Sequence, residues 1–216
     1  MTRLSFFGFL FLFVTACCDD EPMQEDPNPA IENGDHEPMS IGNQWIYQVS
    51  IEQADGTYET RDELDTVSIV GEEQINDNVY YKYEARRYEQ GNNLVQYYRR
   101  DSVGYIIDEH GTIYYSPNNS EGVLNTITLA DGDAEFFVFE YSMADQNTTV
   151  EVPAGTFQTR SYVGKVIPGS DWNEDFTCEK SPYTNYAQDV GIVKREVYYV
   201  SSCRSIVTEL VEYQLK

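Results

Sequence analysis

The sequence is poor in cationic side chains and in histidine, and each shortage excludes a class of function. There are 14 Lys and Arg against 37 Asp and Glu, which gives a formal charge of −23. This charge repels phosphate backbones, so we expect no nucleic-acid partner. With two histidines and no triad, HExxH helix, phosphate-binding glycine loop or dinucleotide fingerprint, a histidine-dependent hydrolase is disfavoured. We therefore predict no catalytic residue, no metal and no cofactor.

Long apolar runs are also missing, except at the N-terminus. An apolar run from Leu4 to Val14 follows the single cation Arg3 and ends shortly before Cys17. This run is too short to remain as a helix across roughly 30 Å of hydrocarbon. Residues 1–16 are therefore predicted to be a cleaved secretory signal.

The end of this signal resembles the lipobox of bacterial lipoproteins. In Val14-Thr15-Ala16-Cys17 two small residues precede the cysteine, and Val14 stands where Leu is commoner in the family. The resemblance implies that cleavage leaves Cys17 as a diacylated, palmitate-type N-terminus whose partner is the membrane. Two acyl chains suffice for stable attachment, whereas one gives only marginal binding. The alternative is an ordinary secretion signal with an incidental cysteine.

An acidic cluster, Asp19-Asp20-Glu21, follows the cysteine and resembles the export signal of Bacteroidetes surface lipoproteins. That resemblance implies an outer-membrane lipoprotein of the bacterial cell envelope, exposed at the cell surface. Alternatively, these acids simply populate a solvated tether.

The segment from Cys18 to Met39 holds eight acids, four prolines and no Lys or Arg. Because it can bury little apolar surface, we expect residues 17–39 to form a disordered, lipidated tether. The remaining 40–216 are enough for a single domain with one core. Loss of Arg3 takes the formal charge to −24, and the tether carries −8 of it, which leaves −16 on the domain.

Hydrophobicity in this domain alternates with a period of two. Trp45, Tyr47, Val49 and Ile51 would share one face of a half-buried strand. Turn residues separate the runs, and we see no amphipathic helix longer than two turns. We predict an all-β antiparallel meander of roughly ten to twelve short strands, curled into an open or closed barrel. Ten further runs have strand character: 65–71, 78–88, 94–100, 104–109, 112–116, 135–141, 148–152, 156–166, 191–200 and 206–215.

Three segments resemble motifs of uncharacterised extracytoplasmic bacterial lipoproteins: Ile41–Tyr47, Val152–Phe157 and Tyr186–Lys194. The fold of that group is similar to the curved antiparallel half-barrel of the lipoprotein carriers LolA and LolB. The motifs consist of turn and core residues. The resemblance therefore implies a fold and no catalytic residue.

Cysteine usage fits an oxidising compartment. With Cys17 assigned to lipid, Cys178 and Cys203 form a natural disulfide pair, and Cys18 is left free, acylated or paired between chains. A bridge closing about 25 residues contributes roughly 3 kcal/mol. A zinc site is disfavoured because no CxxC spacing or neighbouring histidine completes four ligands.

A weak metal candidate lies nearby. Asp171, Asn173 and Asp175 have the alternate spacing of the first half of a calcium loop. Phe176 and Pro182 occupy the positions where an EF-hand needs Gly and Glu, so we favour a solvated acidic loop.

Eighteen tyrosines are the most unusual feature of the composition. Four Tyr-Tyr doublets place one ring on each face of a strand, and outward rings can stack on sugars or apolar ligands. Alternatively, tyrosine simply suits a half-wet sheet. The weak ligand-binding candidates, one from each doublet, are Tyr80, Tyr97, Tyr114 and Tyr198.

Two functions fit these observations. The favoured one is a non-enzymatic, membrane-anchored extracytoplasmic lipoprotein that binds a small apolar lipid-like ligand, a glycan or an envelope protein, or has a structural role. The alternative is a small carboxylate-dependent glycan hydrolase. Binding predicts a concave cavity, and hydrolysis predicts two carboxyls facing each other at roughly 5 to 10 Å.

Overall fold

The computed structural model describes residues 36–118, 122–132, 134–144, 147–170, 178, 180–199 and 202–216. The predicted signal, Cys17, Cys18 and residues 19–35 of the predicted tether lie outside these ranges. Within the residues that are described, no helix has the length and apolar character needed to cross a bilayer.

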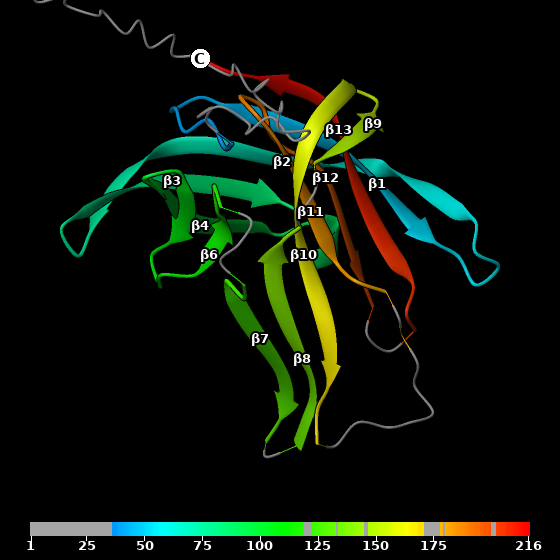
Figure 1. The fold of residues 1–216 in the computed structure, drawn as a ribbon. Helices are drawn as coiled ribbons and strands as arrows, with labels where there is room; N and C mark the ends of the chain where they lie inside the picture. The colour runs from blue at the N-terminus through cyan, green and yellow to red at the C-terminus, as the bar shows by residue number, and fades with distance from the viewer. Residues whose placement is uncertain are drawn as a thin grey trace, which may run out of the picture. The chain divides into compact units, whose positions relative to one another are not determined.

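Thirteen antiparallel strands form one sheet, as the period of two predicts (Figure 1). The sheet order is β6-β5-β4-β3-β2-β1-β13-β12-β11-β10-β8-β7, and β9 pairs with β10. The one helical element of the described ranges is the 3-10 turn η1 (Tyr88–Gln90). The strands are β1 (Gln44–Glu52), β2 (Tyr58–Ile75), β3 (Asn78–Arg86), β4 (Leu94–Ser102), β5 (Tyr105–Asp108), β6 (Ile113–Tyr115), β7 (Asn125–Asp131), β8 (Ala134–Met143), β9 (Thr148–Val152), β10 (Gly155–Pro168), β11 (Tyr183–Ala187), β12 (Gly191–Tyr198) and β13 (Ser205–Gln214).

The sheet curls into a nearly closed barrel whose two edge strands are β6 and β7. Register shifts interrupt the pairing of β1 with β2 and with β13, and of β2 with β3. Such bulges bend a strand and increase its twist. No backbone pairing joins β6 to β7 in the described residues, but side chains cross from β10 to the β6 edge. Tyr162 donates to the Ile113 carbonyl at 3.0 Å, and Arg160 donates to the Tyr115 hydroxyl at 2.9 Å.

β1 anchors the larger of two apolar clusters. Its burial alternates strictly, and Trp45, Tyr47, Val49 and Ile51 are the buried residues, as predicted. The Trp45 indole donates to the Val190 carbonyl at 2.7 Å. The larger cluster gathers residues such as Val67, Tyr83, Val193 and Leu210, and the smaller contains Ile106, Tyr115, Met143, Tyr162 and Tyr186.

Gly191 explains part of the Tyr186–Lys194 motif. Its φ is +99°, and a Cβ built there would lie 3.4 Å from the Trp45 indole nitrogen. Because L-residues rarely adopt this conformation, the position favours glycine. The motif therefore has a backbone role at the start of β12.

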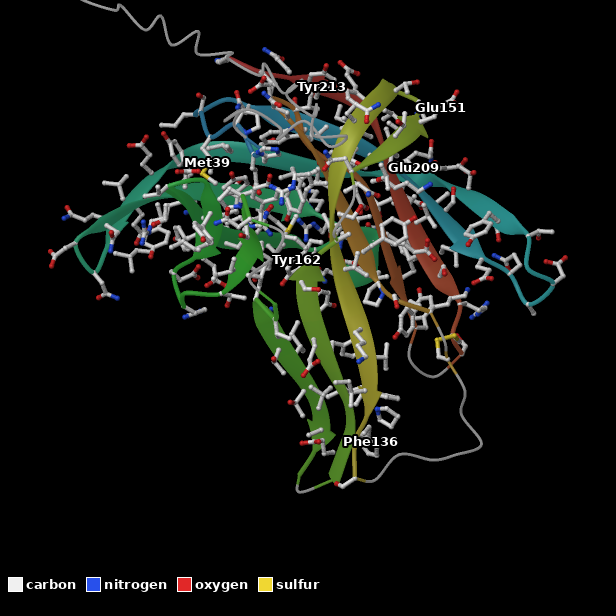
Figure 2. The ribbon with its side chains drawn as sticks, viewed as in Figure 1. Met39, Phe136, Glu151, Tyr162, Glu209 and Tyr213 are labelled. Atoms are coloured by element: carbon white, nitrogen blue, oxygen red, sulfur yellow. A yellow bond between two sulfur atoms is a disulfide. The ribbon has the colours of Figure 1, made fainter. Side chains whose placement is uncertain are left out.

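The domain begins earlier than the predicted boundary at Ser40. The His36 ring stacks on Tyr115 with centroids 4.4 Å apart, and the Glu37 side chain is buried against Arg99. Met39 packs against both apolar clusters (Figure 2). Assigning residues 36–39 to a disordered tether was therefore wrong. The physical reason is that a cation 62 positions later neutralises Glu37, which composition cannot reveal.

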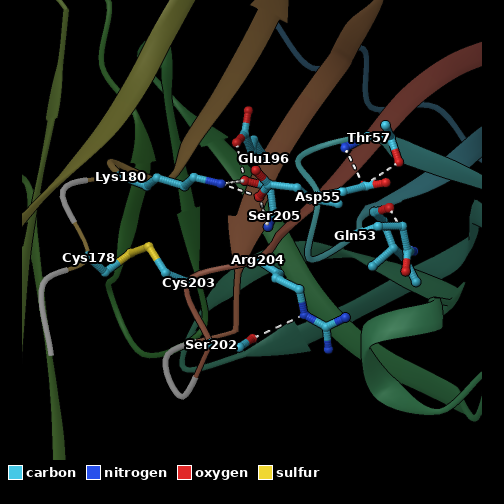
Figure 3. A network of polar contacts seen from close by, with 12 residues as sticks. Gln53, Asp55, Thr57, Cys178, Lys180, Glu196, Ser202, Cys203, Arg204 and Ser205 are labelled. Carbon is cyan, nitrogen blue, oxygen red and sulfur yellow. Dashed lines mark hydrogen bonds and ion pairs between the residues drawn. A yellow bond between two sulfur atoms is a disulfide. The ribbon is translucent and has the colours of Figure 1, made fainter.

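The predicted disulfide between Cys178 and Cys203 is present, with a Cα–Cα distance of 5.5 Å (Figure 3). Beside it, the Lys180 ammonium donates to the Glu52 carboxylate and to the Ser205 hydroxyl. The Ser205 amide also donates to Glu52, at 2.8 Å. The bridge and these contacts tie Cys178 and Lys180 to the end of β1 and the start of β13.

Candidate functional site: a cavity lined by tyrosine and arginine

A cavity of about 410 Å³ lies between the two arms of the curled sheet. Its walls come from β4, β5 and β6 on one side and from β7, β8 and β10–β12 on the other. Seven tyrosines line it: Tyr97, Tyr98, Tyr114, Tyr141, Tyr162, Tyr183 and Tyr186.

Contacts among the rings hold this lining in place. Tyr141 and Tyr162 stack with centroids 4.9 Å apart, on neighbouring strands β8 and β10. The Tyr114 hydroxyl donates to Asp108 at 3.1 Å. Burial raises the pKa of Tyr114, Tyr141 and Tyr162, so these phenols stay neutral at physiological pH. These three rings therefore form an aromatic, uncharged part of the wall, with hydroxyls as polar handles.

Three arginines also line the cavity, although the whole chain has only 14 cationic side chains. Arg99 pairs with Glu37 at 2.9 Å, and its guanidinium lies 4.4 Å from the Tyr114 ring centre. Arg195 pairs with Glu89 at 2.6 Å. These two cations thus have carboxylate partners within the protein.

Arg87, the third, lies where the cavity meets a recess of about 30 Å³. It donates to the Tyr97 hydroxyl at 3.2 Å. The recess is lined by apolar residues such as Trp45 and Val67 and by the carboxylates of Glu37 and Asp65, and its volume suits at most one or two waters. Arg87 and Tyr97 therefore stand where the two spaces meet, as do Ile192 and Arg195.

Three carboxylates line the cavity: Asp108 and Glu196 accept hydrogen bonds from the protein's own donors, and Glu109 lies 3.7 Å from the His110 imidazole. Asp108 accepts from the amides of His110 at 2.9 Å and Thr112 at 2.8 Å, besides Tyr114. Burial raises the pKa of Asp108, but these donors outweigh it and hold the pKa below its ordinary value. Glu196 accepts from the Ser205 hydroxyl at 2.5 Å. In the described part of the chain no three His, Cys, Asp or Glu gather into a metal-binding group.

The structure separates the four tyrosine candidates. Tyr97 and Tyr114 line the cavity, whereas Tyr80 is 6% exposed, beneath the Arg100 guanidinium. Tyr198 does not line it, and its ring lies 6.3 Å from that of Phe139. The calcium-loop candidates Asp171, Asn173 and Asp175 lie outside the described residues.

Sequence reasoning missed most of the site. Tyr141, Tyr162 and Tyr186 are not in doublets, and the three arginines were not candidates. Tyr141, Tyr162 and Tyr186 sit on β8, β10 and β11, so only the order of strands in the sheet brings these rings together. The one available signal was the number of tyrosines, which gives no positions.

No family model matches the sequence, and no curated protein matches it. Solved structures of two bacterial proteins resemble the fold. A provisionally named lipoprotein from Parabacteroides distasonis is 13% identical, covers 84% of this chain and 99% of its own, and has a TM-score of 0.50. A provisionally named exported protein with a YmcC-like fold from Bacteroides fragilis is 16% identical over 85% and 100%, with a TM-score of 0.48. The first likeness shows that the two chains share a fold.

Proposed function

We propose that this protein is a membrane-anchored, extracytoplasmic lipoprotein that binds a small molecule without transforming it. The observation that carries the binding role is the cavity of about 410 Å³ lined by seven tyrosines. Its volume lies within the usual range for small-molecule sites.

The chemistry of the wall supports binding over catalysis. Neutral phenols offer flat apolar faces to a sugar ring or an alkyl chain, and their hydroxyls can orient polar groups. Asp108 and Glu196 already accept hydrogen bonds from neighbouring side chains and amides. Glycoside hydrolysis needs one carboxyl as acid and another as base or nucleophile, and with these two committed to structural contacts Glu109 alone remains among the carboxylates that line the cavity.

The N-terminal residues support the anchor. Val14-Thr15-Ala16-Cys17 has the lipobox pattern, with Cys17 as the acylated residue. The fold is shared with a protein that carries the name of a lipoprotein. The acids at positions 19–21 support an outer-membrane anchor with the domain facing the cell surface.

The binding role is tested by native mass spectrometry of the full chain purified from its own host. We expect a small-molecule adduct on the wild type that is lost in Tyr114→Ala, because Tyr114 lines the cavity. Tyr213→Ala is the matched control, since Tyr213 is 39% exposed and lies away from the cavity. An adduct that survives Tyr114→Ala, or a wild type that carries none, would refute binding in this cavity.

The anchor is tested by fractionation after palmitate labelling. Cys17→Ala should lose the label and leave the membrane fraction. Cys18→Ala removes the adjacent thiol and should retain both, which makes it the control. Membrane retention of Cys17→Ala would show that Cys17 is not the lipid-bearing residue.

A further inference from the structure

Arg87 differs from the other two cavity arginines in its pairing. Arg99 and Arg195 each have a carboxylate at salt-bridge distance, from Glu37 and Glu89. Within the described ranges Arg87 has no carboxylate at that distance, and its side chain donates to the Tyr97 hydroxyl. Among the described acids, Glu89 and Asp65 act on Arg87 electrostatically but form no salt bridge with it, so its guanidinium has no carboxylate in direct contact where the cavity meets the recess.

The surroundings of Arg87 favour an anion from outside the protein. A guanidinium presents five N–H donors in a planar fork that matches a carboxylate, and Tyr97 engages one of its nitrogens. Arg99 and Arg195 lie on the same cavity, but each is already neutralised by its own acid. A ligand carboxylate placed at Arg87 would therefore complete the pattern of three compensated arginines.

The tyrosine rings of the cavity wall determine what kind of ligand body can fit beside the carboxylate. Tyr97 and Tyr114 lie on β4 and β6, and their rings flank the Arg99 guanidinium at 5.1 and 4.4 Å. Tyr141 and Tyr162 stack on the opposite arm. The space between the arms suits a body with an apolar face, while the Arg87 guanidinium lies where the cavity meets the recess.

We propose that the cavity binds a small organic acid whose carboxylate pairs with Arg87 and whose body lies against the tyrosine rings. This inference rests on the proposed binding function and specifies its ligand class. An acidic sugar and a fatty acid share this chemistry, because each joins a carboxylate to a face that can pack on aromatic rings.

Isothermal titration of the full chain with two matched pairs tests the inference and separates the two sources. The pairs are glucuronate with glucose and octanoate with 1-octanol, each at 0.15 M NaCl. In at least one pair the acid should bind about tenfold or more tightly than its neutral partner, as expected for hydrogen bonds to a charged group. The pair that shows this preference identifies the body.

Variants assign the preference to Arg87. Arg87→Gln should remove it, and Arg87→Lys should retain part of it because the charge remains. Arg86→Gln is the matched control: it changes the same charge at the adjacent, exposed position and should leave the preference intact. Thermal melting establishes that each variant is folded. The comparison of acid with neutral compound is also made on the wild-type protein, so this part of the test does not depend on a variant.

Two results would overturn the inference while leaving the binding function standing. One is equal affinity for the acid and neutral members of both pairs. The other is an acid preference that Arg87→Gln leaves unchanged. If none of the four compounds binds and the native mass spectrum shows no adduct, the binding function itself fails.

Discussion

The buried ion pair between Glu37 and Arg99 allows a quantitative prediction of how much the first residues of the domain contribute to its stability. The two side chains are 6% and 9% exposed, and their charged atoms are 2.9 Å apart. Glu37→Gln would leave the Arg99 cation buried with weaker compensation. Breaking a buried pair from one side costs about 3–5 kcal/mol.

A urea titration measures this cost. With an m value of about 2 kcal/mol per molar urea, the loss corresponds to a midpoint that is about 2 M lower. Glu59→Gln provides the same substitution in the exposed pair with Arg61, whose side chains are 58% and 34% exposed. Such pairs contribute about 0–1 kcal/mol, so this control should keep a midpoint close to that of the wild type.

A double variant tests whether the loss of stability comes from the uncompensated charge of Arg99. Glu37→Leu combined with Arg99→Met removes both charges, and should be less destabilised than Glu37→Gln because no buried ion is left uncompensated. If Glu37→Gln shifts the midpoint no more than Glu59→Gln does, residues 36–39 are not held in the fold by this pair and the reasoning is refuted.

Two further predictions concern stability. Reducing the bridge between Cys178 and Cys203, 25 positions apart, should lower the free energy of unfolding by roughly 3 kcal/mol; a variant with alanine at both positions should show the same loss and no response to reductant. Burial raises the pKa of Asp65 above its ordinary 3.8, so the native state holds that proton to higher pH than the unfolded chain does. The free energy of unfolding should therefore fall as pH rises from about 3.8 through the raised pKa, and Asp65→Asn should lose that part of the fall. Urea midpoints at pH 3.5 and 7 check this, and parallel changes in the two proteins would contradict it.

Most strands could be predicted because alternation is a local property. In β1 every second residue is buried, and the sequence shows it directly. β7 was missed because its apolar residues Ile127 and Leu129 are 48% and 40% exposed at a sheet edge, where threonines alternate with them. β11 was missed because a run of five residues with Thr and Asn among its tyrosines carries little apolar pattern.

The sequence by itself determined the all-β class and the pairing of Cys178 with Cys203, because alternation and residue type are local properties. It also carries the predicted lipid-attachment site at Cys17. Only the tertiary structure decided that Glu37 belongs to the fold, that Tyr80 is buried, and that rings from five strands line one cavity. The physical reason is that charge compensation and cavity walls depend on which strands become neighbours when the sheet curls. Residues 62 positions apart then decide each other's burial, as Glu37 and Arg99 do.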